Sequence, residues 1–353
     1  MGTNSRLKVL VTGGAGYIGS HTIVELIESG YEPISIDNYL NSDPVSYDCI
    51  EEVTGISIEH HEVDLRDING LNSVFKKYNN IVGVIHFAAL KSVPDSVKNP
   101  IFCFDNNNNS LANIAAICIE NKIKNLLFSS SCSVYGNLKA KQLPVDEDTF
   151  IGEAASPYAF TKQSGEKLLG YLSTVKPFRS LALRYFNPVG AHMSGDLGEL
   201  PAKRVNNLVP IIAQTADGLR KELTVFGNDW NTRDGSCIRD YVHVSDIARA
   251  HVLGLEKLME NKRLSYFDII NLGSGEGVSV LEAINAFESV NDVKVNYKIG
   301  SRREGDVEAV YSDPQKAKED LDWEPKYSIE DMMRSAWKWQ KKLNRMGLAK
   351  LNL

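Results

Sequence analysis

The sequence has few cysteines, and they show no pairing pattern. They are odd in number, stand far apart and form no C-x-x-C pair: Cys49, Cys103, Cys118, Cys132 and Cys237. Disulfide frameworks and cysteine-based zinc sites need suitably spaced thiols, so we expect free thiols, no metal and a reducing, cytoplasmic compartment. Cys132 stands next to a candidate catalytic serine, although a small buried residue is the simpler interpretation of this thiol.

The chain also lacks long runs of apolar residues and long runs of like charge. No apolar stretch reaches membrane-spanning length, and the first residues are polar, without the apolar centre of a signal peptide. The 39 basic and 45 acidic side chains are interspersed, with a net charge of −6. No segment is typical of a nucleic-acid-binding arm or a membrane-binding face. We therefore expect a small-molecule ligand bound by local groups, and neither a nucleic acid nor a membrane as partner.

Glycine, by contrast, is concentrated between a predicted strand and a predicted helix. A mainly apolar run at residues 7–11 is followed by glycines in the spacing G-x-G-x-x-G, and then by an amphipathic stretch that Gly30 ends. A dinucleotide pyrophosphate needs this arrangement, because the backbone must approach the phosphates and the helix N-terminus must face them. The pattern predicts a dinucleotide site that includes Gly13, Gly16 and Gly19.

An acidic residue follows the second predicted strand. The apolar run at residues 33–36 is closed by Asp37 and Asn38. A carboxylate at this place can accept hydrogen bonds from both ribose hydroxyls of the adenosine half, and it repels a phosphate on that ribose. The sequence thus predicts NAD rather than NADP. A glycine-rich turn without a ligand is the alternative interpretation.

Short apolar runs and helical patterns alternate along the first half of the chain. Candidate strands lie at 56–63, 81–89, 126–131 and 180–184, and candidate helices at 71–78 and 110–120. This alternation predicts an α/β fold with a doubly wound parallel (Rossmann) sheet over 1–185, and ligands at the carboxyl ends of its strands. The 353 residues suffice for two domains, so we expect a smaller α/β substrate domain over 186–353, with helices at 209–216, 244–257, 280–287 and 329–343. The segment near 239–257 is expected to pack on the first domain.

A second informative stretch carries a tyrosine and a lysine four residues apart. Tyr158 and Lys162 share one face of a helix at this spacing. A nearby ammonium favours the phenolate and lowers the pKa of a tyrosine, which makes a base usable near neutral pH. An ordinary pair on a helix surface is the alternative, but the dinucleotide motif and the serines that end the strand at 126–131 favour a catalytic role for Tyr158 and Lys162. The hydroxyl of Ser131 could hydrogen-bond the substrate oxygen that Tyr158 deprotonates.

Together these motifs resemble the UDP-galactose 4-epimerases of the extended short-chain dehydrogenase/reductase family. The resemblance runs from Val9 to Trp323 and includes V-T-G-G-A-G-Y-I-G-S-H, H-F-A-A-L-K-S-V, S-S-S-C-S-V-Y-G, S-P-Y-A-F-T-K, L-R-Y-F-N-P-V-G-A-H, R-D-Y-V-H-V-S-D and R-R-E-G-D. Ala89 and Ser133 depart from the family's usual glycine and threonine without removing a chemical group. The segment at 199–205 also departs and leaves open the conformation of the loop at 199–206.

The resemblance implies a set of site residues. By this resemblance Tyr158 is the general base, and Lys162 holds Tyr158 and the nicotinamide ribose. Ser131 assists the proton transfer. Further NAD contacts are implied for Tyr17, Ile18, Asp37, Asn38, Asp64, Leu65, Phe87, Ala88, Lys91, Asn107 and Tyr185. The UDP-sugar contacts are implied for Lys91, Ser131, Tyr158, Asn187, Asn207, Leu208, Arg239, Arg303, Asp306 and Val310. Asp306 could accept from a ribose or pair with Arg302 or Arg303, and the arginines could bind a diphosphate or ordinary acids.

By the same resemblance the reaction is the NAD-dependent interconversion of UDP-galactose and UDP-glucose in galactose metabolism, through a 4-keto sugar. The family is usually homodimeric, and the helix at 110–120 and the helix of Tyr158 are candidate contacts. A nucleotide-sugar 4,6-dehydratase is one alternative, but it needs an acid pair where this chain has Cys132 and Ser133. A non-catalytic dinucleotide-binding protein is the other; such proteins usually lose the tyrosine or the lysine.

The residue four places after the aspartate of R-R-E-G-D lines the sugar pocket in this family. Val310 stands there, and family members with a small residue tend to accept N-acetylated sugars. We therefore expect activity on UDP-N-acetylglucosamine and UDP-N-acetylgalactosamine as well. Alternatively, Val310 packs the pocket wall while other side chains exclude the acetamido group.

Overall fold

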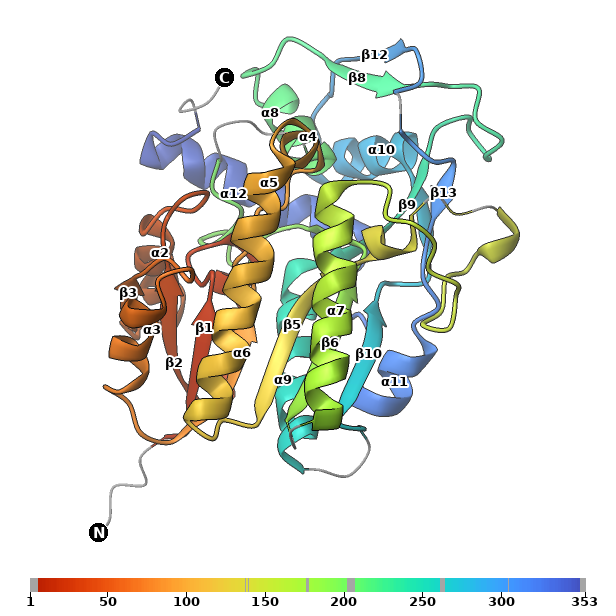
Figure 1. Cartoon of the computed structure of the whole chain (residues 1–353). Helices are drawn as coiled ribbons and strands as arrows, with labels where there is room; N and C mark the ends of the chain where they lie inside the picture. Colours follow the sequence, from red (N-terminus) through yellow and green to blue (C-terminus); the bar gives the residue numbers. More distant parts are fainter. Residues whose placement is uncertain are drawn as a thin grey trace.

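A seven-stranded parallel sheet forms the centre of the molecule (Figure 1). The computed structural model describes residues 6–136, 138, 140–175, 178–201, 207–260, 264–303 and 305–349. The strand order is β10-β6-β5-β4-β1-β2-β3, and every neighbouring pair is parallel. The bounds are β1 (Lys8–Thr12), β2 (Glu32–Asp37), β3 (Glu59–Glu62), β4 (Ile81–His86), β5 (Asn125–Ser131), β6 (Arg179–Tyr185) and β10 (Phe267–Leu272). The predicted doubly wound α/β fold is confirmed.

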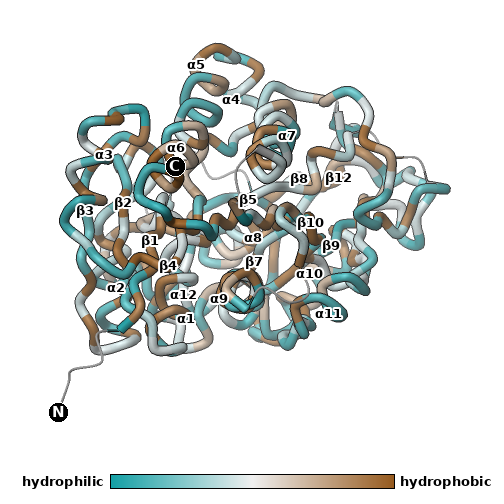
Figure 2. The backbone as a smooth tube through the Cα atoms, turned by 60° about the horizontal axis from the view of Figure 1, so that its bottom comes forward, coloured by the Kyte–Doolittle hydropathy of each residue, from teal (hydrophilic) through white to brown (hydrophobic). Residues whose placement is uncertain are grey.

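Both faces of this sheet are buried, which explains the continuous apolar runs of the strands. In β1, Val9 and Val11 face one layer of helices and Leu10 faces the other. The first layer contains α1 (Tyr17–Glu28), α2 (Val45–Thr54), α9 (Val244–Glu260) and part of α12 (Ile329–Met346). The second contains α3 (Ile68–Phe75), α6 (Ser110–Glu120) and α7 (Pro157–Val175). Figure 2 shows hydrophobic colour on the central strands and hydrophilic colour on much of the periphery.

The second half of the chain contributes to this sheet. Strand β10 pairs with β6 along its whole length, and α9 packs against α1, β5 and β6. The segment near 239–257 therefore lies against the large sheet through α9. A boundary between two domains at residue 185 remains a prediction. Two elements that follow this residue in the sequence, β10 and α9, belong to the large sheet and to the helices that cover it.

The remaining elements form a smaller body around a second core. Strand β9 (Ile238–His243) pairs with β11 (Gly277–Ser279), β13 (Ala309–Val310) and β7 (Asn187–Val189), and β8 (Leu223–Phe226) pairs with β12 (Tyr297–Gly300). The helices α8 (Leu208–Ala216), α10 (Val280–Asn291) and α12 bury apolar side chains between them. Helix α11 (Gln315–Leu321) lies outside this body: it packs against β10 and α9, and its buried side chains belong to the core of the large sheet. In Figure 1 this body lies above the carboxyl ends of the parallel strands.

Several local expectations differ from the structure. Strand β3 is shorter than the predicted 56–63, because it is an exposed edge strand with one neighbour. Helix α12 continues past the predicted end at residue 343 to Met346, and Gly347 in the left-handed conformation ends it. The sequence did not predict α4 (Val93–Lys98), α5 (Pro100–Phe104) or the π-helical turn Asp105–Asn109, which leads into α6. Within the described part of the chain, no helix is long and apolar enough to cross a membrane.

Candidate active site

The glycines after β1 are required by close packing. Gly13 has a φ of 71°, and a Cβ there would lie 2.7 Å from the backbone nitrogen of Ala88. A Cβ on Gly19 would lie 2.2 Å from the carbonyl oxygen of Gly13. Any side chain would therefore push the loop away from β4 or from α1. The loop can stay close to both elements only with glycine at these two positions.

The start of α1 offers a site for an anion. Gly16 caps the helix, and no side chain in the described structure caps it. The N–H groups of the first turn are thus left for another acceptor, and the helix dipole favours a negative one. These observations fit the pyrophosphate of a dinucleotide, as the glycine spacing predicts.

Asp37 lies at the end of β2 beside this loop. Its carboxylate accepts hydrogen bonds from Ala15 N (3.1 Å), Tyr39 N (3.0 Å) and Ser42 Oγ (2.8 Å). Burial raises the pKa of Asp37, and these hydrogen bonds oppose the rise. A carboxylate has about four acceptor positions, so it retains capacity for a ribose hydroxyl.

The other predicted cofactor residues cluster at the same edge of the sheet. Hydrogen bonds from Arg66 hold the pKa of Asp64 low, at about 2, and Asn38 Nδ2 donates to the same carboxylate at 3.2 Å. Asn107 is buried in the π-helical turn, where it bonds the backbone N–H and carbonyl of Leu90. Ile18, Leu65, Phe87, Ala88 and Tyr185 are buried or half-buried around the loop or strand ends. Tyr17, at the start of α1, donates a hydrogen bond of 2.6 Å to the carbonyl of Gly190.

Tyr158, Lys162 and Ser131 meet where the first turns of α7 lie against the end of β5. The Nζ of Lys162 is 5.7 Å from the centre of the Tyr158 ring and donates to Ser129 O at 2.5 Å. The Oγ of Ser131 accepts from Ser133 N at 3.2 Å, which leaves its own proton available. Tyr158 and Lys162 therefore share one face of α7, as their spacing predicts.

The pKa of Tyr158 differs from the expectation. Burial raises it to about 12, and a hydrogen bond with Ser131 opposes the rise. The sequence predicts a lowered value, because an ammonium at this spacing favours the phenolate; the loss of water around the buried phenol outweighs that effect. Burial also lowers the pKa of Lys162 to about 8, and Glu166 opposes this shift.

Apart from Lys91, Ser131 and Tyr158, the predicted UDP-sugar residues lie on the smaller body. Arg239 and Arg303 both contact Asp306: Arg303 Nη2 lies 2.7 Å and Arg239 Nη2 3.4 Å from its Oδ1. Of the two arginines named for Asp306, Arg303 is the one that pairs with it, while Arg302 pairs with Asp229; acceptance from a ribose stays a prediction. Val310 and Arg239 are register partners in β13 and β9, and Asn187 Nδ2 donates to Asp240 O.

Val310 is half-buried and packs against an apolar cluster that includes Phe186 and Cys132. Leu208 is the first residue of α8, and Asn207 is its N-cap residue, without a capping hydrogen bond from the side chain. The Nδ2 of Asn207 lies 3.3 Å from both carboxylate oxygens of Glu199, and Lys91 Nζ lies 2.8 Å from Oε1 of Glu199. The loop at 199–206 falls outside the described residues from 202 to 206.

Sequence reasoning missed three polar residues that lie next to predicted site residues or their neighbours. Glu166 and Arg184 form a buried ion pair, and Glu199 joins Lys91 to Asn207. Glu166 stands four residues after Lys162, so the helical spacing could have revealed it. Nothing local marks Arg184 or Glu199, since their partners lie far away in the sequence.

Comparisons with known proteins agree with this geometry. A family model described as GDP-mannose 4,6 dehydratase matches residues 10–336. The UDP-glucose 4-epimerase of Homo sapiens is 44% identical over 341 residues, which are 95% of this chain and 96% of that protein. The crystal structure of a UDP-glucose-4-epimerase from Stenotrophomonas maltophila, with bound NAD and formylated UDP-arabinopyranose, has a TM-score of 0.92 at 42% identity, covering 97% of this chain and 100% of that one. The UDP-Glc/GlcNAc 4-epimerase of Campylobacter jejuni has a TM-score of 0.81 at 33% identity, covering 95% and 99%.

Proposed function

This chain belongs to the UDP-glucose 4-epimerase family, and we propose that Tyr158, Ser131 and Lys162 perform the proton chemistry of its reaction. The enzyme interconverts UDP-galactose and UDP-glucose, with NAD as cofactor. The observation that carries the residue assignment is the meeting of these three side chains at the end of β5, next to a glycine loop that fits a pyrophosphate.

Tyr158 is the base. Its phenolate takes the proton of the sugar 4-hydroxyl, and the Ser131 hydroxyl donates a hydrogen bond to the same sugar oxygen. NAD, when bound, supplies a cationic ring that accepts the carbon-4 hydrogen as hydride and later returns it. The 4-keto sugar turns and presents its other face, and Tyr158 then returns the proton to the oxygen. The two half-reactions balance, with no net oxidation.

The cofactor is held by the carboxyl edge of the large sheet. The first turn of α1, with Gly13, Gly16 and Gly19, receives the pyrophosphate, and Asp37 accepts from the adenosine ribose. The ammonium of Lys162 holds the nicotinamide ribose and favours the phenolate of Tyr158. Support comes from the uncapped start of α1 and from the remaining acceptor capacity of Asp37.

The nucleotide sugar is held by the smaller body. Arg239 and Arg303 have fork-shaped donors that match diphosphate oxygens. Both now contact Asp306, which is only 11% exposed, so a diphosphate that they bind shares them with this acid. Asn187, Asn207 and Leu208 complete the nucleotide side of the site.

One assay tests this function. Purified protein is given UDP-galactose without added NAD, and the nucleotide sugars are separated over time. We expect UDP-glucose as the product and no change in mass. A product lighter by one water would indicate the 4,6-dehydratase, and no turnover would indicate a binding protein. The dehydratase is disfavoured because Cys132 and Ser133 supply no carboxyl pair after Ser131.

We extend this proposal to N-acetylated UDP-sugars. Val310 is much smaller than a tyrosine, and it lies in β13, next to Arg239 in β9. A pocket bounded by valine leaves room for an acetamido group at sugar carbon 2. The similarity to the UDP-Glc/GlcNAc 4-epimerase of Campylobacter jejuni also supports this extension.

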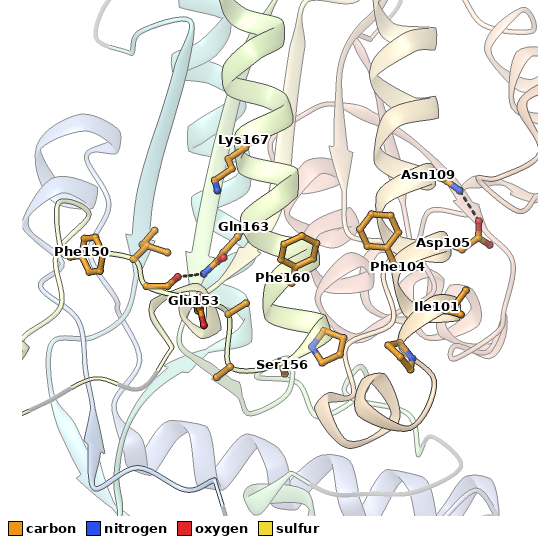
Figure 3. Close-up of a pocket in the computed structure, with 16 residues that line it drawn as sticks. Ile101, Phe104, Asp105, Asn109, Phe150, Glu153, Ser156, Phe160, Gln163 and Lys167 are labelled. Carbon is orange, nitrogen blue, oxygen red and sulfur yellow. Dashed lines mark hydrogen bonds between the residues drawn. The ribbon is translucent and has the colours of Figure 1, made fainter.

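We further propose that two copies of the chain associate through α5 and α7. Apolar side chains line a groove there, and the rings of Phe104 and Phe160 stack 6.1 Å apart (Figure 3). Ile101 is 82% exposed and Phe160 50% exposed. Such a contiguous apolar surface is typical of a protein interface. A second copy would cover it and lie within one turn of Tyr158.

The cytoplasm is the compartment that we propose for the enzyme. All five cysteines are free, and four of them are buried. Burial raises the pKa of Cys118 and Cys49, so these thiols resist oxidation and metal binding.

A further inference from the structure

Three consecutive serines of β5 each contact a residue of α7, and those three residues are four positions apart. Ser131 lies beside Tyr158 and opposes the rise of its pKa, and Ser129 O accepts from Lys162 Nζ at 2.5 Å. Ser130 Oγ donates to Glu166 Oε1, also at 2.5 Å. The residues of α7 form one stripe along the helix, because four residues are close to one turn. Glu166 is the member of this stripe that has no role in the proposed chemistry.

Glu166 is itself held from behind by an arginine. Arg184 of β6 donates through Nε to Glu166 Oε1 at 2.9 Å and through Nη2 to Oε2 at 2.7 Å. The side chain of Arg184 is 1% exposed and that of Glu166 is 6% exposed. The remaining Nη1 donates to Tyr135 OH at 2.9 Å. Tyr135 ends the short 3-10 turn Cys132–Tyr135 that directly follows Ser131.

A buried ion pair of this kind is poorly explained by stability. The desolvation of both charges offsets most of their attraction, and apolar residues of similar volume often serve as well. What the pair does provide is geometry. It joins α7, β5, β6 and the turn after β5 on both sides of Ser131, through Ser130 before it and Tyr135 after it.

We propose that Glu166 and Arg184 are a positioning pair that fixes Ser131 and Lys162 relative to Tyr158. The pair touches neither the substrate nor the cofactor; it acts through Ser130 and the backbone of Ser129 and Ser131. This proposal rests on the proposed function of Tyr158, Ser131 and Lys162. An error of about 1 Å in the placement of such groups can lower a rate by up to roughly 100-fold.

The test replaces both charges together, so that neither is left buried without a partner. We expect Glu166→Leu/Arg184→Met to fold, to retain bound NAD and to lower kcat by roughly 10- to 100-fold, with a KM for UDP-galactose within about 2-fold of the wild type. Asp246→Asn is the matched control, because Asp246 is equally buried but accepts from Lys326 N and Tyr327 N, away from β5. A folded double variant with a wild-type kcat would overturn the proposal.

A milder variant covers the case in which the double variant fails to fold. Ser130→Ala removes only the hydroxyl that joins β5 to Glu166. We expect a several-fold lower kcat with an unchanged KM and an unchanged melting temperature. If Ser130→Ala turns over like the wild type, Glu166 does not act through Ser130 and the proposal is wrong.

A spectroscopic measurement separates this proposal from the proposed function. The phenolate absorbance of Tyr158, taken as the difference between each protein and its Tyr158→Phe form, reports the pKa of this residue. The groups that face Tyr158 are Ser131 and Cys132 from β5 and the turn after it, Cys103 from α5, Tyr185 from β6, and Lys162. Loss of the Ser131 hydrogen bond should shift the titration of the double variant to higher pH, even if the wild type turned over no UDP-sugar. An unchanged titration would contradict the positioning role of Glu166 and Arg184 but would leave the proposed function intact.

Discussion

The ammonium of Lys162 lies 5.7 Å from the centre of the Tyr158 ring, one turn along α7; Lys162 is buried and Tyr158 is half-buried. Burial works against both charges, since it raises the pKa of the phenol and lowers that of the ammonium. The charged pair is therefore disfavoured by desolvation and favoured by mutual attraction. This balance decides how much of Tyr158 is available as a base.

Replacement of the base is the most direct test of the assignment. Tyr158→Phe removes the hydroxyl and keeps the ring, so the fold and the bound NAD should be unaffected. We expect kcat to fall by about 10²–10⁴-fold, which is the usual contribution of a positioned base. The measurement is kcat with UDP-galactose, with Tyr171→Phe as the control, since Tyr171 is an exposed residue of the same helix. A near-normal rate would remove Tyr158 from the mechanism.

The pH profile should report the ammonium. With the pKa of Tyr158 raised, kcat/KM of the wild type should increase with pH, because more phenolate forms. The increase should flatten near pH 8, where Lys162 loses its proton. Lys162→Met has no ammonium to favour the phenolate, so its profile should shift to higher pH and lack the change near 8. Profiles from pH 6 to 10, on protein with a verified NAD content, decide this; superimposable profiles would contradict the role of Lys162.

Cofactor choice should depend on Asp37. The protein as purified should carry NAD, because the carboxylate at the end of β2 repels a 2′-phosphate. Asp37→Asn removes the charge, and we expect a larger share of bound NADP. Asp43→Asn is the control, since Asp43 lies in the loop after β2 and its carboxylate accepts from Val45 N. Mass spectrometry of the ligand released by denaturation gives the ratio, and NADP as the main ligand of the wild type would reverse the assignment.

The sugar range should depend on Val310. We expect the wild type to interconvert both the plain and the N-acetylated UDP-sugar pairs. Val310→Tyr should lower kcat/KM for the N-acetylated pair by more than about 10-fold, because a steric block discriminates more strongly than a missing methylene, which is worth ~1–3 kcal/mol. Val310→Ala is the control and should retain both activities. Absence of N-acetyl turnover by the wild type would sink the hypothesis, and so would unchanged turnover by the tyrosine variant.

Oligomeric state should depend on the apolar groove. Ile101→Glu places a charge where a second copy would pack, and we expect it to shift the protein from dimer to monomer at equal concentration. Ile299→Glu is the control, because Ile299 is exposed on β12, outside the groove. Sedimentation velocity distinguishes the two species. A wild type that sediments as a monomer would contradict this interface.

Sequence periodicity was sufficient for the parts of the molecule that local rules govern. Helix α6 spans the predicted Ser110–Glu120, and the glycine loop lies between β1 and α1, because only glycine tolerates the close approach at Gly13 and Gly19. The spacing of Tyr158 and Lys162 likewise follows from helix geometry alone.

Long-range pairing of polar groups was beyond sequence reasoning. Arg184 and Glu166 read as ordinary charged residues, because nothing local shows that β6 brings them together inside the protein. The pKa of Tyr158 was misjudged for the same reason, since the degree of burial depends on the whole fold. The polar run that includes Asn107 gave no helical pattern, yet tertiary contacts with Leu90 and Thr161 hold it in a π-helical turn.

The cations of the proposed nucleotide-sugar site already have acidic partners. Arg239 and Arg303 contact Asp306, and Lys91 contacts Glu199. A diphosphate that arrives exchanges one set of ion pairs for another, so little net Coulomb energy is gained on encounter. Because the whole chain also has a net charge of −6, long-range attraction does not speed the approach of an anionic substrate. Capture of the UDP-sugar therefore depends on short-range fit after diffusion, and it should vary only weakly with ionic strength.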